Sequence, residues 1–349
     1  MIKVLIDDDS ASMRMFLEHI LSADPGLMVI GTAGNGEEAI SQADRLAPDV
    51  ITMDIDMPLM NGLDATRRIM ETRPVPIVIL SGVLDRDEVI TSFRALEAGA
   101  VAALQKPQGE GHPDHAWEVE ALIQTVKLMS EIKLVRRWPQ AKKGETVSPL
   151  PETAGIRPSQ TPQVVAIGAS TGGPVVIKEI LSLLEKRFTL PVLIVQHMSP
   201  GFIRGFAEWL ALSSGLPVHV ASDGVKLLPG NVYVAPDGCH MLVDRNKGIR
   251  LSDAPPENGL RPAVSALFRS VTKIYGGRAV GVLLTGMGRD GADELLIMKK
   301  MGAVTIIQDQ ASSVIYGMPG EAAKLDAASF TLPPARIGAL LAAIEHQSQ

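Results

Sequence analysis

The chain has almost no cysteine and no excess of basic residues. Its 349 residues include one cysteine, Cys239, and carry a formal net charge of -6 at pH 7. A single cysteine excludes an internal disulfide and is typical of a reducing cytoplasm. The acidic balance argues against a nucleic-acid surface, since phosphate binding needs clustered Lys and Arg. We therefore expect a cytoplasmic protein that does not bind nucleic acid.

Long hydrophobic runs are also missing. No apolar run approaches the ~18 residues that a membrane-spanning helix needs. The N-terminal strand pattern leads directly into acidic residues, so we expect neither a signal peptide nor insertion into a membrane. The length is sufficient for two ordinary domains, each with its own core. We expect the protein to be monomeric.

The first part of the chain has the pattern of a parallel α/β sheet. Short runs rich in β-branched residues alternate with helical patterns up to about Pro107, which is typical of a (βα) repeat. A helical pattern over residues 117–135 completes this part, so we predict a first domain over residues 1–137. The predicted strands cover residues 4–6, 29–30, 50–53, 77–80 and 101–104.

A change of composition separates this domain from the rest. Five prolines lie among polar residues between Pro139 and Gln163, which predicts a linker over residues 138–162. Strand and helix patterns resume at Val164, and closely spaced turns over residues 216–251 indicate hairpins. We predict a second, doubly wound α/β domain over residues 163–349, with a hairpin insertion and a mixed rather than purely parallel sheet.

Acidic residues gather at strand ends of the first domain. Asp7, Asp8 and Asp9 end the first predicted strand, and Asp54 ends the third. The carboxyl ends of strands in a doubly wound sheet converge on one edge, where ligands bind. Crowded carboxylates repel one another unless a hard cation lies among them, and Mg²⁺ prefers oxygen ligands. The simpler alternative is that Asp8 and Asp9 only cap the following helix.

Two further side chains add complementary chemistry at this edge. Ser81 ends the fourth predicted strand and Lys106 follows the fifth, so a hydroxyl and an ammonium group would help to neutralise a phosphoryl group. With them the domain resembles a response-regulator receiver, which has a flavodoxin-like five-stranded parallel sheet. The resemblance is carried by Asp8-Asp9-Ser10, Asp54-Ile55-Asp56-Met57-Pro58-Leu59-Met60-Asn61-Gly62, Ser81 and Lys106-Pro107.

The receiver resemblance implies a role for each of these side chains. Asp54 accepts a phosphoryl group from a sensor histidine kinase, and Asp8 and Asp9 help Asp54 to hold Mg²⁺. Ser81 couples the phosphoryl group to a conformational change, and Lys106 pairs with it. A receiver is a switch, however, so it does not identify the chemistry of the second domain.

One residue departs from the receiver pattern. Asp7 stands where receivers usually place an apolar strand residue. The departure puts the local packing and the metal affinity in question, although the other motif residues of the domain are present.

The second domain opens with a candidate nucleophile. The apolar run of residues 164–169 delivers Ser170 into a turn flanked by Gly168 and Gly172, just before a helical pattern. A buried strand, a sharp turn and a helix are the context of a G-x-S-x-G elbow, which lifts the serine clear of its neighbours. The alternative is that the glycines serve only the turn.

A serine nucleophile needs a base within hydrogen-bond reach, and His197 is the best candidate. It follows a second buried-strand pattern, residues 191–196. If the two strands are neighbours, their ends lie ~5 Å apart, which brings the imidazole close to Ser170. The alternatives are His219, which alternates with valines in a strand, His240 in a turn of the hairpin region, and His346 in a polar tail.

Asp290 is the candidate carboxylate that orients this histidine. It follows a third strand pattern in a glycine-rich turn, and it would also suit the cap of the next helix. Gly286, Gly288 and Gly291 spell the G-x-G-x-x-G of a dinucleotide site. Asp290 would stand inside that turn and repel a pyrophosphate by about 4 kcal/mol for charges ~4 Å apart at a dielectric of ~20, which argues against nucleotide binding.

The order Ser170, His197, Asp290 is not the Ser, Asp, His order of α/β-hydrolases, so we do not expect that fold. The chain is instead similar to the chemotaxis protein-glutamate methylesterases, the CheB family, which join a receiver, a Pro-rich linker and a hydrolase. The motifs are Gly168-Ala169-Ser170-Thr171-Gly172-Gly173, Gln196-His197-Met198, Tyr233-Val234-Ala235-Pro236, Leu284-Thr285-Gly286-Met287-Gly288-Arg289-Asp290-Gly291, Gln308-Asp309 and Gly317-Met318-Pro319-Gly320-Glu321-Ala322.

This resemblance implies an esterase that acts on the cytoplasmic helices of chemoreceptors. Ser170 attacks the carbonyl of a glutamyl methyl ester, or of a glutamine amide, while His197 takes its proton and Asp290 holds the imidazole. Ester hydrolysis needs no cofactor. Our candidates for the oxyanion donors are the backbone N–H groups near Thr171 and Met287. By family behaviour, the unphosphorylated receiver covers the hydrolase edge and phosphorylation weakens that contact.

Two other classes of protein remain as alternatives. The first is a phosphorylation-gated binding protein with an inactive hydrolase-like domain. The second is a receiver-linked transcription factor, which would need a basic helical effector domain. No such basic stretch follows the predicted linker.

Overall fold

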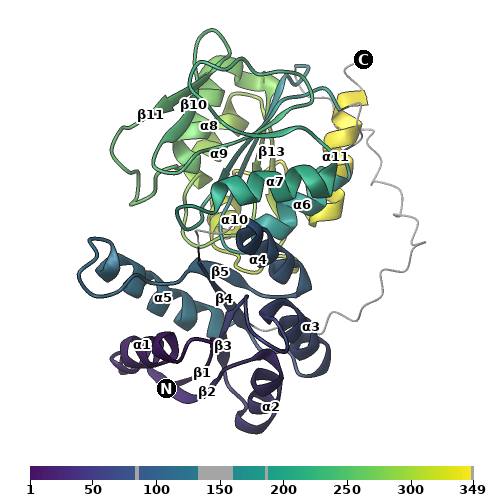
Figure 1. Cartoon of the computed structure of the whole chain (residues 1–349). Helices are drawn as coiled ribbons and strands as arrows, with labels where there is room; N and C mark the ends of the chain where they lie inside the picture. The colour runs from purple at the N-terminus through teal and green to yellow at the C-terminus, as the bar shows by residue number, and fades with distance from the viewer. Residues whose placement is uncertain (83–85, 133–159, 185–187, 347–349) are drawn as a thin grey trace. The chain divides into compact units, whose positions relative to one another are not determined.

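The computed structural model describes residues 1–82, 86–132, 160–184 and 188–346 of the chain. The chain divides into two compact units, Met1–Lys143 and Gly144–Gln349, which are described separately here (Figure 1). The predicted linker, residues 138–162, lies almost entirely outside the described residues, so the predicted domain boundaries stay predictions.

The first unit is a five-stranded sheet with the strand order β2-β1-β3-β4-β5, and every neighbouring pair is parallel. This order is that of the flavodoxin-like doubly wound fold, which confirms the prediction for this domain. The elements are β1 (Ile2–Asp7), α1 (Ala11–Ser22), β2 (Leu27–Ala33), α2 (Gly36–Leu46), β3 (Val50–Asp54), α3 (Gly62–Thr72), β4 (Ile77–Ser81), α4 (Arg86–Ala98), β5 (Ala102–Gln105) and α5 (His115–Ser130).

Short polar side chains fix where three helices of this unit begin. Ser10, Asn35 and Asn61 precede α1, α2 and α3, and each accepts a hydrogen bond from a backbone N–H three residues later. Such N-caps satisfy donors that the helix itself leaves unpaired. Because Ser10 caps α1, the alternative that Asp8 and Asp9 serve as the caps of this helix is wrong.

The second unit contains a seven-stranded sheet with the order β14-β13-β12-β6-β7-β9-β8. Its elements are β6 (Val164–Ala169), α6 (Gly173–Ser182), β7 (Val192–Gln196), α7 (Ile203–Ser214), β8 (Val218–Val220), β9 (Val232–Val234), β10 (His240–Val243), β11 (Ile249–Ser252), α8 (Val264–Tyr275), a 3-10 helix (Gly276–Arg278), β12 (Ala279–Leu283), α9 (Ala292–Lys300), β13 (Val304–Gln308), α10 (Met318–Lys324), β14 (Phe330–Leu332) and α11 (Pro334–His346).

The predicted mixed sheet is wrong in this unit. Every neighbouring pair in the seven-stranded sheet is parallel. Between β8 and β9 the chain crosses over through residues 221–231 rather than reversing in a tight turn, so the two strands run in the same direction. The predicted hairpin is present, but β10 and β11 form a separate two-stranded antiparallel sheet.

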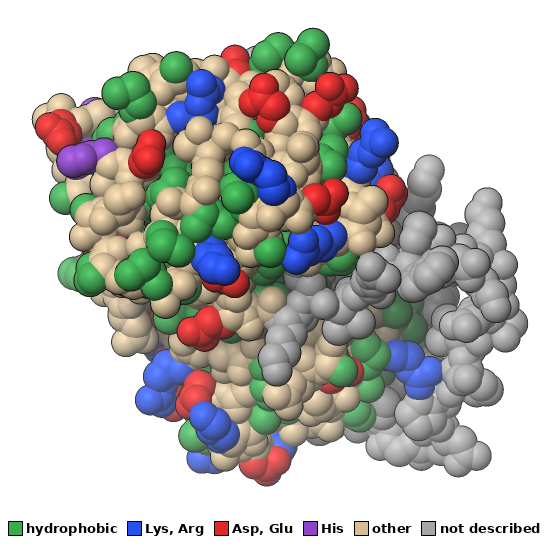
Figure 2. Space-filling model, turned by 90° about the horizontal axis from the view of Figure 1, so that it is seen from below, with side chains coloured by type: hydrophobic (Ala, Val, Ile, Leu, Met, Phe, Trp, Pro, Cys, Tyr) green, Lys and Arg blue, Asp and Glu red, His purple; other side chains and the backbone are tan. Residues whose placement is uncertain are grey.

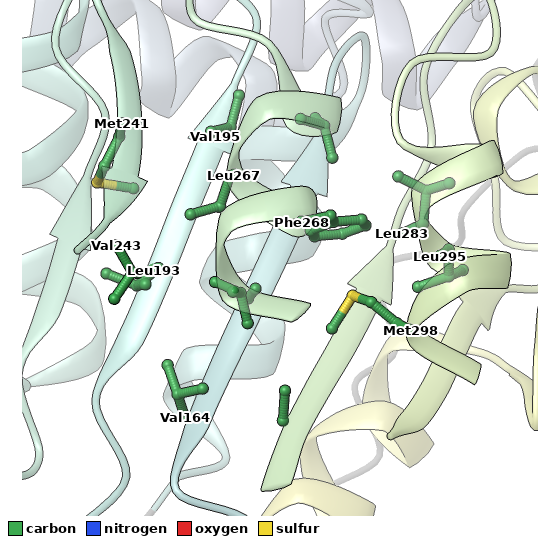
Figure 3. Packing of buried hydrophobic residues seen from close by; sticks show 14 of the residues in the cluster. Val164, Leu193, Val195, Met241, Val243, Leu267, Phe268, Leu283, Leu295 and Met298 are labelled. Carbon is green, nitrogen blue, oxygen red and sulfur yellow. The ribbon is translucent and has the colours of Figure 1, made fainter. Parts of the chain in front are cut away.

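The core of the second unit lies between the sheet and α8 with α9. Leu267 and Phe268 of α8 pack with Leu193 and Val195 of β7 and with neighbouring apolar residues (Figure 3). Helices α6, α7 and α11 lie together on the other face of the sheet (Figure 1). A parallel sheet that is covered on both faces needs nearly continuous apolar strands, and β6, β7 and β12 are buried along their whole length.

The strand order creates a topological switch point at the carboxyl end of β6. Strand β6 has β7, the next strand of the chain, on one side and β12 on the other. The direction of winding therefore reverses beside β6. In open α/β sheets, the crevice outside the carboxyl ends of the strands at such a switch point is where ligands bind.

Candidate functional site

Ser170 follows β6 directly at this switch point. Its backbone N–H donates to the Thr285 carbonyl at 3.0 Å, and its own carbonyl accepts from Gly173 at 2.8 Å. Gly172 has a φ of 78°, and a Cβ added there would lie 2.6 Å from the Val314 side chain. The turn that presents Ser170 therefore needs glycine at position 172.

His197 follows β7 and lies beside Ser170 in the register of the sheet. Ala169 pairs with Gln196, and the His197 N–H donates to the Ala169 carbonyl at 3.0 Å. Alternate side chains of β6 and β7 contact the core under α8. Continuation of this alternation places the Ser170 and His197 side chains on the same face.

Asp290 contacts the ring of this histidine. The Nε2 atom of His197 lies 3.1 Å from Oδ2 of Asp290, and both side chains are largely buried. The same Oδ2 accepts a hydrogen bond from the Val264 N–H at 2.6 Å, and Oδ1 accepts one from the Ser265 N–H at 3.0 Å. The structure therefore places Asp290 in contact with His197, and the register of β6 and β7 places Ser170 beside that histidine at the backbone.

The carboxylate of Asp290 caps a helix other than the predicted one. The N-cap of the following helix, α9, is Gly291 with a φ of 84°. Asp290 instead bonds to the first N–H groups of α8, which are 26 and 25 residues away in sequence. The predicted capping of the next helix is thus wrong, because the turn at Gly291 directs the Asp290 side chain towards α8.

These contacts determine the charge of Asp290. Burial opposes its ionisation, but the close His197 imidazole and hydrogen bonds from Ser265 outweigh that effect and hold the pKa of this carboxyl below its ordinary value. The N-terminus of α8 also favours a negative charge at this point. Asp290 is therefore an anion across the neutral range, facing a ring nitrogen of His197.

The two segments that carry the oxyanion candidates are held against Ser170. The Thr171 carbonyl accepts a hydrogen bond from the Thr285 hydroxyl at 2.9 Å. Gly286, just before Met287, lies so close that a Cβ there would be 2.6 Å from the Cβ of Ser170. The backbone at Thr171 and at Met287 thus flanks the serine, while the Met287 side chain is 62% exposed.

The other histidines of this unit have local roles. His240 is buried at the start of β10, where Nδ1 accepts from the Ala263 N–H and Nε2 lies 3.2 Å from the Pro255 carbonyl. His240 therefore belongs to a strand rather than to the predicted turn. His219 lies in β8 with Nε2 2.9 Å from Asn231 Oδ1. His346 is the last residue of α11, and its side chain lies outside the described part of the chain.

The sequence analysis assigned no role to two buried glutamines at this edge, which it named only as parts of motifs. Gln196 and Gln308 are the last residues of β7 and β13. Gln308 accepts from the Thr285 N–H at 2.9 Å and donates to the Ser312 carbonyl at 2.9 Å, so it supports the turn that precedes Asp290. Each glutamine is a polar residue at the end of an apolar strand pattern, and this feature of the sequence could have indicated a role at the site.

The first unit has its own cluster at the carboxyl edge of its sheet. The ammonium of Lys106 lies 2.7 Å from Asp54 Oδ2 and 2.9 Å from Asp8 Oδ2. The other oxygen of Asp54 accepts from the Ile55 N–H at 2.8 Å. Burial raises the pKa of Asp54 to about 6, against the opposing effect of Lys106.

The carboxylates of this cluster are placed to share a cation. One oxygen from each of Asp8, Asp9 and Asp54 lies within 4.8 Å of the others. Three carboxylate oxygens at such spacing fit Mg²⁺, which binds through carboxylates and keeps several waters. The donor set thus agrees with the predicted metal site.

Ser81 lies next to this cluster at the end of β4. Its side chain is buried, and its hydroxyl donates to the Glu88 carboxylate on α4 at 2.9 Å. Its carbonyl accepts from the Lys106 N–H at 3.0 Å. Ser81 therefore links the carboxyl edge of this sheet to α4.

Asp7 has an unusual environment. It is 1% exposed, and neither of its carboxylate oxygens has a hydrogen-bond partner among the described residues. Burial, reinforced by the charges of Asp54 and Asp8, raises the pKa of Asp7 to about 8. The departure from the receiver pattern thus buries an uncharged carboxylic acid in β1.

The surface agrees with the composition. On the face drawn in Figure 2, the coloured Lys and Arg side chains are interspersed with Asp and Glu. Within the described part of the chain, no helix has both the length and the apolar composition to cross a membrane.

Comparisons with known proteins agree with this geometry. The family model of the CheB methylesterase matches residues 165–341, and that of the response regulator receiver domain matches residues 4–114. A protein-glutamate methylesterase/protein-glutamine glutaminase of Geobacter metallireducens is 61% identical over 97% of each chain. A relative with the same name in Nitrosospira multiformis is 51% identical over 98% of this chain and 96% of its own.

A solved structure resembles the second unit. The CheB methylesterase catalytic domain of Thermotoga maritima is 35% identical, with a TM-score of 0.51. The match covers 54% of this chain and all of that domain.

Proposed function

This chain belongs to the CheB methylesterase family and carries an N-terminal receiver domain, and from that premise we propose that it hydrolyses glutamyl methyl esters on chemoreceptors. We propose that it also deamidates specific glutamines there, as the names of its relatives state for them. The observation that carries the proposal is the contact between His197 and the buried Asp290 beside Ser170. We place the reaction in the cytoplasm and expect a monomer.

The chemistry follows from these three side chains. The Ser170 oxygen attacks the ester carbonyl while the imidazole of His197 takes the hydroxyl proton. Since Nε2 faces Asp290, Nδ1 is the nitrogen that receives this proton. The oxyanion lies between the backbone N–H groups of Thr171 and Met287.

The two remaining steps restore the enzyme. The tetrahedral intermediate expels methoxide, or amide nitrogen in the deamidation, which leaves as methanol or ammonia with the proton held by His197. A water then attacks the acyl-enzyme, gives a proton to the imidazole, and releases the glutamate while the Ser170 oxygen regains its proton. Asp290 stays ionised and stabilises the imidazolium in both halves of the reaction.

The test is methanol release from methylated receptor membranes. Ser170→Ala removes the nucleophile and is expected to nearly abolish release, since the loss of a covalent step and its base assistance costs at least ~10²–10⁴-fold. Ser182→Ala is the matched control, because Ser182 is an exposed serine of α6 whose hydroxyl bonds only to backbone carbonyls. Most of the activity remaining in Ser170→Ala would exclude this mechanism.

The same experiment separates the enzyme from the alternative binding protein. A phosphorylation-gated binding protein with an inactive hydrolase-like domain releases no methanol. It also fails to react at Ser170 with a serine-reactive ester probe. Labelling of wild-type protein, but not of Ser170→Ala, is the result expected for the esterase.

We further propose that the receiver gates this activity. Asp54, with Lys106 Nζ at 2.7 Å, is the acceptor of a phosphoryl group from a sensor histidine kinase. Asp8, Asp9 and Asp54 would hold Mg²⁺, which supplies positive charge for the transfer. Ser81 would pass the change to α4 through Glu88. In this proposal the unphosphorylated receiver restrains the esterase, and phosphorylation releases it.

Gating is tested with a small phosphodonor and three variants. We expect the phosphodonor to raise methanol release by wild type and by the exposed neighbour Asp56→Asn, but not by Asp54→Asn. A protein that begins near Pro162 is expected to be active without the phosphodonor. Unchanged or lower activity after removal of the receiver would contradict restraint by this domain.

A further inference from the structure

A buried glutamine lies directly beneath the candidate nucleophile and base. Gln196 is the last residue of β7 and is 3% exposed. The preceding residues Leu193 and Val195 contact the core under α8. Strand alternation therefore sends the Gln196 side chain to the opposite face of the sheet, where α6 begins.

The amide of Gln196 bridges two backbone segments. Its Nε2 donates to the Ser170 carbonyl at 2.8 Å and to the His197 carbonyl at 2.8 Å. An amide nitrogen carries two hydrogens, so both are committed. One side chain thus connects the residue after β6 to the residue after β7, which are the candidate nucleophile and base.

The surroundings fix the orientation of this amide. Its Oε1 has no hydrogen-bond partner among the described residues. That oxygen packs against Gly173, where an added Cβ would lie only 2.1 Å from it. A flipped amide would direct Oε1 at two carbonyl oxygens, so the two donated hydrogen bonds require the observed orientation.

We infer that Gln196 is a positioning residue, which holds Ser170 and His197 in register through their carbonyls. This inference rests on the proposed function of those two residues. Gln196 lies on the face away from their side chains and acts only through the backbone. Ser170 is also held by its backbone bonds to Thr285 and Gly173, and the His197 N–H donates to the Ala169 carbonyl. Loss of the amide removes the tie between the Ser170 and His197 carbonyls, so the two residues can shift relative to each other. A misplacement of about 1 Å between reacting groups costs on the order of 10²-fold in rate.

The test compares two substitutions of Gln196 with a matched control in the full-length protein. Gln196→Met keeps the length but has no donor, and Gln196→Glu keeps the shape but directs a carboxylate at two carbonyls. Thr305→Val is the control, because Thr305 is also buried and its hydroxyl bonds to Ser329. Thr305 lies near the start of β13, at the edge of the sheet opposite to Ser170 and His197. Methanol release, thermal unfolding and the rate of Ser170 labelling by a serine-reactive ester are measured for each.

If Gln196 positions these residues, its substitution should lower kcat without changing KM, and an equal loss of stability elsewhere should leave kcat unchanged. Gln196→Met is expected to lower kcat and the labelling rate by on the order of 10²-fold with an unchanged KM. Thr305→Val is expected to lower the unfolding temperature to a similar extent with kcat retained. Gln196→Glu should lower the same two rates, since a carboxyl group cannot donate to both the Ser170 and the His197 carbonyl.

The outcomes distinguish this inference from the proposed function. A wild-type protein that releases no methanol contradicts the proposed function. An active wild type, with Gln196→Met close to it in kcat and in labelling rate, overturns the role of Gln196 alone. If Gln196→Met does not fold, Gln196→Glu decides the question: a wild-type kcat and labelling rate in that variant overturn the inference.

Discussion

Asp290 faces His197 and the N-terminus of α8 with the same oxygen. Its Oδ2 lies 3.1 Å from His197 Nε2 and 2.6 Å from the Val264 N–H. A carboxylate that is fixed by two helix N–H groups does not have to reorganise when the imidazole becomes charged, which is the condition for electrostatic preorganisation. The contact therefore joins the fold of the second unit to its proposed chemistry.

Replacement of this carboxylate should separate catalysis from folding. Asp290→Asn keeps an acceptor oxygen for only one of the two α8 N–H groups and removes the charge, so we expect kcat to fall by on the order of 10²–10⁴-fold. The free energy of unfolding should fall by about 1 kcal/mol for the charge at the helix N-terminus, plus roughly 1–3 kcal/mol for the α8 N–H that loses its acceptor. Methanol release and thermal unfolding measure the two effects. Asp293→Asn, an exposed carboxylate paired with Arg289, is the control, and an equal loss of kcat in both variants would contradict the role of Asp290.

Asp7 predicts an unusual dependence of stability on pH. Its pKa is raised from 3.8 to about 8 in the folded state, so between these values the folded state keeps a proton that the unfolded state has lost. Unfolding is then increasingly favoured as pH rises. Asp7→Val restores the apolar residue usual in receivers and removes this effect.

The difference between the two proteins is the measurable quantity. We expect Asp7→Val to gain stability over wild type as pH rises from about 4 to about 8, by at most about 1.4 kcal/mol per pH unit, with no further gain above that range. Urea unfolding of both proteins across this range, followed by the transition of the first unit, is the measurement. Parallel stability curves would show that Asp7 is ionised in the folded protein.

The position of His197 predicts which ring nitrogen carries the proton at rest. Because Nε2 lies 3.1 Å from the ionised Asp290, the neutral imidazole should be protonated at Nε2, which leaves Nδ1 as the nitrogen that can accept the Ser170 proton. Nitrogen-15 NMR of labelled histidines distinguishes the two tautomers. His240 is an internal reference, since its Nδ1 accepts from the Ala263 N–H and its proton must also lie on Nε2. A proton on Nδ1 of His197 would reverse the proposed direction of proton transfer.

The sequence was sufficient to predict which residues lie at the carboxyl ends of the strands. It was not sufficient to predict strand directions and contacts that depend on segments distant in the sequence. Parallel strands end at one edge, so residues that follow apolar runs, such as Ser170 and His197, were expected to meet. The direction of β8 relative to β9 depends on the path of residues 221–231, for which turn residues gave no signal. The attachment of Asp290 to α8 joins positions 25 and 26 residues apart, and the local pattern favoured the adjacent helix instead.

Gly173 should prove as important as Gln196, because the two residues share one space. Gly173 has an ordinary negative φ, so the cost of a side chain there is steric. A Cβ at this position would lie 2.1 Å from Gln196 Oε1 and 2.7 Å from the Ala169 Cβ. Gly173→Ala must therefore displace the amide that bridges Ser170 and His197, and we expect kcat to fall with little change in KM.

A double-mutant cycle tests whether this loss passes through the amide. Gln196→Ala removes the displaced group, so the further cost of Gly173→Ala in that background should be smaller, with a coupling of roughly 0.5–3 kcal/mol for residues in contact. Gly109→Ala is the control, because a Cβ at Gly109 meets no atom within 4 Å. Additive effects on kcat would mean that Gly173 acts on the turn at Ser170 independently of Gln196. Coupling would instead show that the glycine is required because the buried amide lies against it.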